Sequence, residues 1–120
     1  MGAADIDLVA AVPVIPVTSA ADAIAFYRDR LGFDLAFEQG EYAGVIRSGV
    51  MLHLDGTVNG AAGQVTARIE TEGVDALYAE LEPAGAVDPN EPIHTMPWGA
   101  RQFSVRDCCG NRITFVHSGS

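Results

Sequence analysis

Residues 97–116 read PWGARQFSVRDCCGNRITFV and predict two strands joined by a tight turn. The segments 101–106 and 112–117 carry β-branched and aromatic residues, whereas the Asp-x-x-Gly-Asn stretch between them is typical of a turn. The only tryptophan of the chain, Trp98, lies between a proline and a glycine just before the first of these strands. Its indole is a large, flat surface with one hydrogen-bond donor. Trp98 therefore either fills the core or forms one wall of a binding site.

Outward from this hairpin, the chain shows the same succession of elements twice. The first unit, about residues 8–55, has a helix that starts at Ser19 and ends at Gly32. Its strands are expected over 8–17, 33–38, 42–48 and 50–55. Pro13 and Pro16 indicate either an edge strand or the end of a strand.

The small residues of 56–63 predict a flexible linker between the two units. The second unit, about residues 64–118, repeats the pattern of the first. It is expected to contain a strand over 64–71, a helix over 74–83, a loop over 87–99 with at most one short strand, and the strands of the hairpin.

Two βαβββ units in tandem predict an α+β fold with mixed sheets. A length of 120 residues fits one domain, 1–120, with a sizeable core. Each unit alone would leave a sheet face uncovered, so the two units must pack together or with another chain.

Composition limits the possible partners and the location. Seven basic against sixteen acidic side chains give a net charge of −9, which argues against nucleic acid and anionic membranes because phosphate binding needs clustered cations. The apolar run at 8–17 has no basic segment before it and is too short to span a bilayer. Cys108 and Cys109 are adjacent, which favours a reduced pair over a strained vicinal disulfide. We therefore expect a cytoplasmic protein.

The chain resembles the glyoxalase/bleomycin-resistance/dioxygenase superfamily, also called the vicinal oxygen chelate proteins. The helix-to-strand corner at 25–33 (AFYRDRLGF) is similar to the corner found throughout that superfamily. The stretches 42–47 (YAGVIR), 75–80 (DALYAE), 97–99 (PWG) and 106–111 (RDCCGN) are similar to the bleomycin-binding resistance proteins within it.

This resemblance implies curved sheets in a homodimer, often with an exchanged N-terminal strand, that encloses two clefts at the subunit boundary. It also implies a protein that sequesters an antibiotic and carries out no reaction.

Enzymes of the superfamily hold a divalent metal ion, and the resemblance locates their ligand positions near Val12, His53, Thr66 and Thr114. Of these side chains only His53 is an ordinary metal ligand. We therefore expect no metal, no other cofactor and no catalytic residue. Two alternatives stay open: a metal-dependent lyase, isomerase or dioxygenase of the same superfamily, and a small-metabolite-binding accessory protein.

The expected ligand is a planar, aromatic, DNA-damaging natural product of the bleomycin, enediyne, anthraquinone or mitomycin type. By resemblance, Trp98, Phe37 and Tyr42 stack on its rings, although Phe37 also fits a core position. The strand that carries His53 lines the cleft, where this imidazole forms a hydrogen bond to the ligand. Glu38 favours a cationic group near these strands.

Two further residues complete the expected site, Arg68 and Phe103. Arg68 occupies a fifth-strand position where the bleomycin-binding proteins have a tryptophan; an arginine stacks on flat rings but repels a cationic tail. There is also one additional residue, Ala100, between Trp98 and its strand. Both departures predict a cleft of the same kind with a different ligand.

Overall fold

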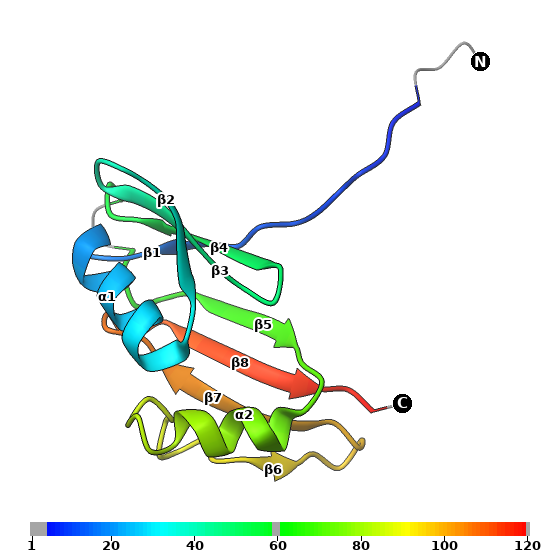
Figure 1. Cartoon of the computed structure of the whole chain (residues 1–120). Helices are drawn as coiled ribbons and strands as arrows, with labels where there is room; N and C mark the ends of the chain where they lie inside the picture. The colour runs from blue at the N-terminus through cyan, green and yellow to red at the C-terminus, as the bar shows by residue number, and fades with distance from the viewer. Residues whose placement is uncertain (1–4, 59–60, 120) are drawn as a thin grey trace.

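A computed structural model describes residues 5–58 and 61–119, and its secondary structure consists of two helices and eight strands (Figure 1). The elements of the first unit are β1 (Val14–Pro16), α1 (Ala20–Leu31), β2 (Asp34–Gln39), β3 (Tyr42–Arg47) and β4 (Val50–Asp55). Those of the second are β5 (Thr66–Glu70), α2 (Val74–Leu81), β6 (His94–Thr95), β7 (Arg101–Arg106) and β8 (Arg112–His117). None of the helices in the described residues is long and apolar enough to cross a bilayer.

The two units have the same topology, which confirms the prediction of tandem βαβββ units. Sheet A has the strand order β1-β4-β3-β2, and sheet B has the equivalent order β5-β8-β7-β6. The first strand of each unit pairs in parallel with the last, and the other pairs are antiparallel. Both sheets are therefore mixed, and the fold is α+β as expected.

The expected strand over 8–17 is wrong for most of its length. Only Val14–Pro16 pair with β4, at the edge of sheet A, one of the two positions that the prolines indicate. The residues before them, 5–13, form an N-terminal arm that projects away from both sheets (Figure 1). Leu8 and Val9 in this arm are 97% and 92% exposed, because no strand among the described residues pairs with them.

The helices begin and end where local chemistry requires. The Ser19 side chain accepts a hydrogen bond from the Asp22 backbone at 3.2 Å and caps α1, and Gly32 ends the helix with a φ of 73°, which favours glycine. Helix α2 ends at Leu81, two residues earlier than expected. The predicted linker includes residues 59 and 60, which lie outside the described residues.

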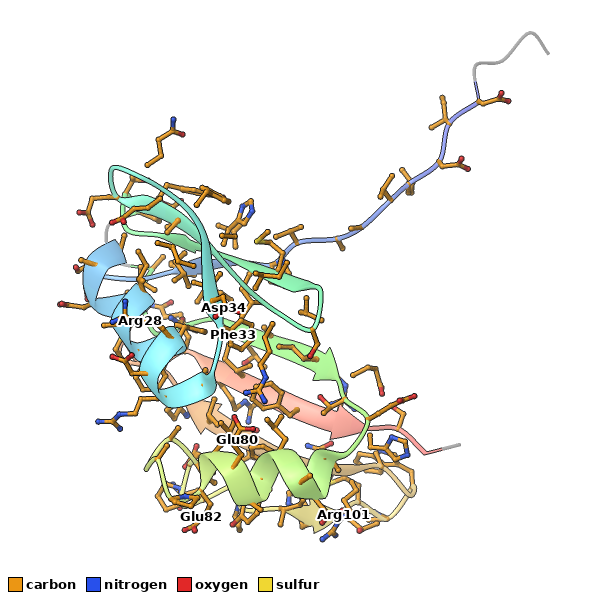
Figure 2. The ribbon with its side chains drawn as sticks, viewed as in Figure 1. Arg28, Phe33, Asp34, Glu80, Glu82 and Arg101 are labelled. Carbon is orange, nitrogen blue, oxygen red and sulfur yellow. The ribbon has the colours of Figure 1, made fainter. Side chains whose placement is uncertain are left out.

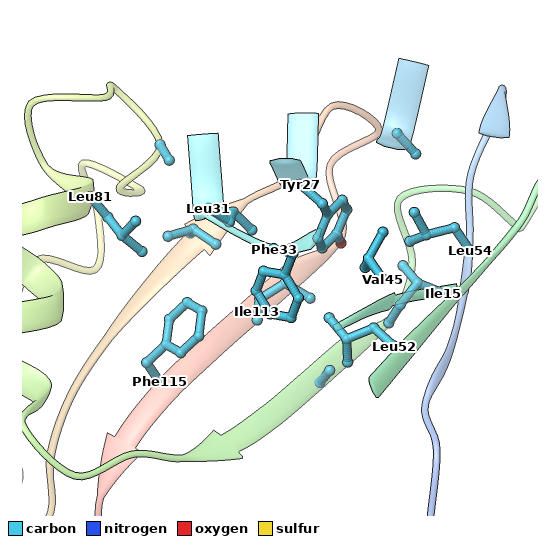
Figure 3. Packing of buried hydrophobic residues seen from close by; sticks show 14 of the residues in the cluster. Ile15, Tyr27, Leu31, Phe33, Val45, Leu52, Leu54, Leu81, Ile113 and Phe115 are labelled. Carbon is cyan, nitrogen blue, oxygen red and sulfur yellow. The ribbon is translucent and has the colours of Figure 1, made fainter. Parts of the chain in front are cut away.

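One hydrophobic cluster joins the two units. Figure 3 shows Tyr27, Leu31 and Phe33 facing Ile113 and Phe115 of the second unit. The prediction that the units cover each other is therefore confirmed: the helix-side faces of both sheets share one core.

An ion pair supports this junction at the surface. Figure 2 shows Glu80 on the side of α2 that is turned towards the first unit. Its carboxylate accepts hydrogen bonds from Arg47 at 2.7 and 2.9 Å, and the same guanidinium donates to the Leu31 carbonyl at 2.7 Å. The hydrogen bonds from Arg47 lower the pKa of Glu80. The pair is half-exposed, so its contribution to stability is small.

A buried polar network around the β7–β8 turn makes the deepest connection between the units. Asp107 accepts hydrogen bonds from the Tyr27 hydroxyl at 2.8 Å and from the Asn111 amide group at 3.0 Å. Asn111 also donates to the Pro16 carbonyl at 2.8 Å and accepts from the backbone of Gly63 and Val65. We call these residues the turn network. Burial and the neighbouring carboxylate raise the pKa of Tyr27 well above its ordinary value, so its hydroxyl stays a donor.

We predict that Tyr27→Phe lowers the free energy of unfolding by about 1.5–3 kcal/mol, the range for a hydrogen bond to a charged group. The measurement is urea denaturation at neutral pH. Tyr78→Phe is the matched control, since no partner of the Tyr78 hydroxyl is found among the described residues, and it should change stability by less than about 0.5 kcal/mol. Equal stability of the two variants would contradict the role of the turn network.

Candidate ligand-binding site

The face of sheet A turned away from the helices carries three of the expected site residues. The rings of Phe37 and Tyr42 stack, with centroids 6.3 Å apart and planes at 20°. The imidazole of His53 meets both rings edge-on, at 5.2 and 5.3 Å. We call Phe37, Tyr42 and His53 the aromatic face. Phe37 is 38% exposed, so it belongs to this surface and not to the core.

The strand register brings these side chains together. β3 and β4 pair Gly44 with His53, and β2 pairs Phe37 with Gly44. A bulge between Leu35 and Phe37 shifts the register of β2 and redirects the strand. Without this shift, Phe37 would lie opposite Ala43, whose side chain is buried in the core.

Gly44 provides the space on which the phenyl ring lies. A Cβ at this position would be 2.2 Å from Cε1 and 2.7 Å from Cδ1 of Phe37. Real Cβ atoms do not approach so closely, so any larger residue would displace the ring. Sequence reasoning missed Gly44, because only the pairing with β2 shows what the missing side chain allows.

A hydrogen bond fixes the orientation of the imidazole. The Tyr42 hydroxyl and Nδ1 of His53 are 2.8 Å apart. This bond uses Nδ1, so Nε2 is the ring nitrogen left for a ligand. The aromatic face thus offers two ring surfaces and one polar atom.

The corresponding face of sheet B is polar and concave. A cavity of about 290 Å³ lies there, and we call the residues that line it the polar cup: Thr66, Arg68, Glu91, His94, Met96, Gln102, Arg112 and Thr114. The structure thus locates the expected residue Arg68 on the wall of a cavity. Thr66 and Thr114 were named in the sequence analysis only as positions of metal ligands in related enzymes. The remaining residues of the polar cup were not predicted. Alternation along the predicted final hairpin was the signal that could have found Gln102 and Arg112.

Trp98 lies on the hairpin between β6 and β7. The turn closes through hydrogen bonds from Gly99 N to the Met96 carbonyl at 2.9 Å and from Met96 N to the Ala100 carbonyl at 2.7 Å. Trp98 itself is 69% exposed, so it does not fill the core of the chain. Ala100, the additional residue, is buried beneath the turn.

The aromatic face and Trp98 are far apart within one chain. Figure 1 shows β2 and β6 at opposite ends of the molecule, with β4, β5, β8 and β7 between them. The structure therefore does not bring Trp98 together with Phe37 and Tyr42 in a single subunit.

Two of the expected site residues lie elsewhere. Phe103 is fully buried, with its ring against Tyr78 at 5.1 Å and Phe115 at 5.4 Å; it offers no surface to a ligand, and the expectation for it is wrong. Glu38 is exposed and pairs with Ala43, so its side chain alternates to the opposite side of β2 from Phe37. The structure therefore does not place Glu38 in the aromatic face.

Within one chain, the four positions that the resemblance gives for metal ligands do not come together around His53. β1 presents Val14 to His53, not Val12, which lies in the N-terminal arm. Thr66 and Thr114 lie on sheet B, where Thr114 bonds to the Ser104 hydroxyl at 2.8 Å. The residues present at these positions do not fit the metal site that the superfamily's enzymes use.

Within the described residues, candidate metal ligands gather at a different place, in the β7–β8 turn: Asp107, Cys108 and Cys109. Each carboxylate oxygen of Asp107 already accepts two hydrogen bonds. The two sulfur atoms are 3.7 Å apart and not bonded. Burial, followed by the hydrogen bond with Cys109, raises the pKa of Cys108 to about 12, which disfavours a thiolate ligand.

A larger cavity, of about 530 Å³, opens on the helix side between the two units. Phe33, Leu77 and Phe115 contribute to its lining, with the Arg47–Glu80 ion pair beside them. None of the seven expected site residues lines it, so the two sheet faces remain the candidate site.

Paired βαβββ units with an open, mixed sheet in each unit define a class of small-molecule-binding proteins and metal enzymes. The family model for the Glyoxalase/Bleomycin resistance protein/Dioxygenase superfamily matches residues 6–115, and the chain belongs to this superfamily.

Several relatives match most of the chain. The bleomycin resistance proteins of Geobacillus stearothermophilus and Staphylococcus aureus are 31% identical to the chain, over 87% of its length and 92% of theirs. The bleomycin-binding protein of Streptomyces verticillus, solved with copper(II)-bleomycin, is also 31% identical, covers 97% of the chain and 100% of its own, and has a TM-score of 0.83.

An enzyme of this superfamily also has the same fold. A lactoylglutathione lyase from Agrobacterium tumefaciens has a TM-score of 0.75 at 19% identity, with 94% of this chain and 96% of that chain covered. At that identity the likeness concerns the fold alone.

We predict that Gly44→Ala destabilises the protein by about 1–3 kcal/mol, as expected for overpacking, and that most of this cost disappears in a Phe37→Ala background. The measurement is a double-mutant cycle of unfolding free energies. If Gly44→Ala costs the same in both backgrounds, the contact between the phenyl ring and Gly44 does not determine the aromatic face.

Proposed function

We propose that this chain is a binding protein that sequesters a planar, aromatic antibiotic of the bleomycin type and leaves it chemically unchanged. The observation that carries the proposal is the aromatic face: two stacked rings and an imidazole, partly exposed and held by the strand register. Each aromatic pair formed with a ligand contributes roughly 0.5–1.5 kcal/mol beyond area burial. Relatives that are named as bleomycin resistance proteins support the same reading.

We further propose that the site is completed in a homodimer. The β6–β7 hairpin, which carries Trp98, and strand β2, which carries Phe37, lie at opposite ends of one chain (Figure 1), so a cleft lined by both residues needs a second copy. A two-fold arrangement would bring sheet A of one subunit against sheet B of its partner, twice. Trp98, Phe37, Tyr42, His53 and Arg68 would then line each of two equivalent clefts.

The N-terminal arm supports this dimer. Ile6, Leu8 and Val9 are 78–97% exposed, and a run of apolar side chains in water is unfavourable unless another surface covers it. Exchange of the arm between two subunits, continuing the edge at Val14, would bury these side chains. We therefore propose that the two subunits exchange their N-terminal strands.

The proposal also covers several types of ligand and the location of the protein in the cell. Enediyne, anthraquinone and mitomycin types remain candidates, because stacking alone does not select among flat ring systems. We propose neither nucleic acid nor membrane as a partner, since five of the seven arginines form ion pairs with acidic side chains. Two free cysteines are consistent with the reducing cytoplasm.

The main alternative is a metal-dependent enzyme of the same superfamily. Its metal positions here hold His53, Thr66, Thr114 and an aliphatic residue, a donor set that does not suit a catalytic divalent ion. The second alternative is a metabolite-binding accessory protein, which would use the same faces for a different ligand.

We predict that metal-free bleomycin binds the purified protein and quenches the fluorescence of its only tryptophan. Phe37→Ala should weaken binding about tenfold in calorimetry, since a stacked pair and its buried area are lost. Leu35→Ala is the matched control, an exposed apolar residue on the same strand, and should change the affinity little.

A panel of flat antibiotics separates the alternatives. Binding of a mitomycin or an enediyne in place of bleomycin would retain the proposal with another ligand. A stoichiometric, tightly held divalent ion with turnover of a substrate would overturn it in favour of the enzyme. No response to any antibiotic would favour the accessory protein.

We predict that the protein sediments as a dimer and that Leu8→Asp together with Val9→Asp dissociates it, because two charges would replace buried apolar side chains. Asp5→Ala, in the same arm, is the control and should leave the dimer intact. Analytical ultracentrifugation over a concentration series makes the measurement. A wild-type monomer at every concentration would exclude the shared clefts.

A further inference from the structure

We infer that the polar cup binds an anionic, oxygen-rich end of the ligand, and that Arg68 selects it. This inference rests on the proposed function, since it assigns the chemical character of one part of the sequestered molecule. It concerns residues outside the aromatic face and attributes a selective role to Arg68.

Arg68 differs from every other cation of the chain. All seven basic residues are arginines, and five of them form ion pairs: Arg28, Arg47, Arg101, Arg106 and Arg112. Arg30 donates to the Ala84 carbonyl at 3.1 Å. For Arg68, neither a hydrogen bond nor an ion pair is found in the part of the chain that the structure describes. Its planar set of donors is therefore available to a ligand.

The polar cup contains no other unbalanced charge. The guanidinium of Arg112 is neutralised by Glu91, at 2.6 Å. The imidazole of His94 is engaged with the Pro92 carbonyl at 2.6 Å and the Met96 sulfur at 3.1 Å. The charge of Arg68 therefore determines the sign of the field inside the cavity.

The carboxylate of Glu70, which interacts electrostatically with Arg68, does not cancel this charge. Glu70, two residues further along β5, bonds to the hydroxyl and the backbone N–H of Ser118. These hydrogen bonds are the first cause of the lowered pKa of Glu70, and Arg68 is a lesser one. Glu70 thus has its own partner at the far end of the strand, outside the cavity lining.

One of the residues that line the polar cup has a buried acceptor without a partner. The side-chain oxygen of Gln102 is inaccessible to solvent and accepts no hydrogen bond from the residues that the structure describes. A buried polar atom in this state costs free energy. A hydroxyl or N–H group of a ligand, entering beside the anionic group, would satisfy it.

The size of the cavity limits what it accepts. Sites for whole drug-sized ligands run from about 300 to 1,000 Å³, and the polar cup, at about 290 Å³, is at the lower end. It is large enough for one polar end group, while the flat rings need a separate surface. The aromatic face is such a surface, so the ligand has a flat aromatic part and an anionic part with an adjacent donor.

The test uses three anthraquinones that differ only at position 2: a carboxylate, a neutral hydroxymethyl group and a cationic aminomethyl group. Calorimetry on the full chain measures the affinity for each, with bleomycin as the reference ligand for the proposed function. We expect the carboxylate compound to bind at least about tenfold more tightly than the aminomethyl compound, in spite of the net charge of −9.

Three variants of the polar cup and one control variant separate the roles. Arg68→Met should abolish the preference for the carboxylate, and Arg68→Lys should keep part of it. Arg28→Met is the matched control: it removes one exposed cation far from the polar cup and makes the same change in net charge, so the preference should remain. Gln102→Leu should weaken binding of the hydroxymethyl compound, which can donate a hydrogen bond, more than binding of the carboxylate.

The outcomes distinguish the inference from the function on which it rests. Equal affinities for the three compounds, or a preference that survives Arg68→Met, would overturn the inference while bleomycin binding keeps the proposed function. Binding of bleomycin without binding of any anthraquinone would also overturn it. Failure of every ligand to bind would remove the proposed function itself. Circular dichroism of each variant verifies that the fold is intact.

Discussion

The buried turn network determines how the two units meet, and the site depends on it. Asn111 uses both amide hydrogens and both acceptor positions, on Asp107, Pro16, Gly63 and Val65. These contacts tie the end of β1, the start of the second unit and the β7–β8 turn to one side chain. A fully satisfied buried network adds rigidity, whereas removal of one member leaves the others unpaired in a low dielectric. The mutual position of the two sheets is therefore set by polar geometry as well as by the apolar core.

This junction also decides which surfaces remain for function. Because the helix-side faces of both sheets share one core, the opposite face of each sheet stays open. The two open faces differ in chemistry: Phe37, Tyr42 and His53 cover one, and Arg68 and Gln102 belong to the other. A tandem repeat thus yields two open sheet faces of different chemical character.

Sequence patterns predicted the repeat, both helices and most strands, because capping residues and alternation are local signals. They failed where the outcome depends on a partner strand. Val9 and Phe103 are equally apolar, yet one is exposed and the other is fully buried. The bulge in β2 places Phe37 opposite Gly44, and no local sequence pattern predicts this bulge. Gln102 and Phe103 are neighbours, and alternation along β7 puts them on opposite faces of sheet B, but the cavity that Gln102 lines becomes visible only in the folded chain.

Net charge and local charge act at different distances, and they need not favour the same group. Surface charges separated by more than about 8 Å are largely screened at physiological salt, so the excess of nine negative charges influences mainly the approach of a ligand. Two opposite unit charges about 4 Å apart near a protein surface attract each other by on the order of 4 kcal/mol, before the cost of desolvation is subtracted. At contact, the positive charge of Arg68 therefore favours an anionic group, although the net charge of the chain is negative. A ligand whose cationic part follows the overall field and whose anionic part meets Arg68 reconciles the two.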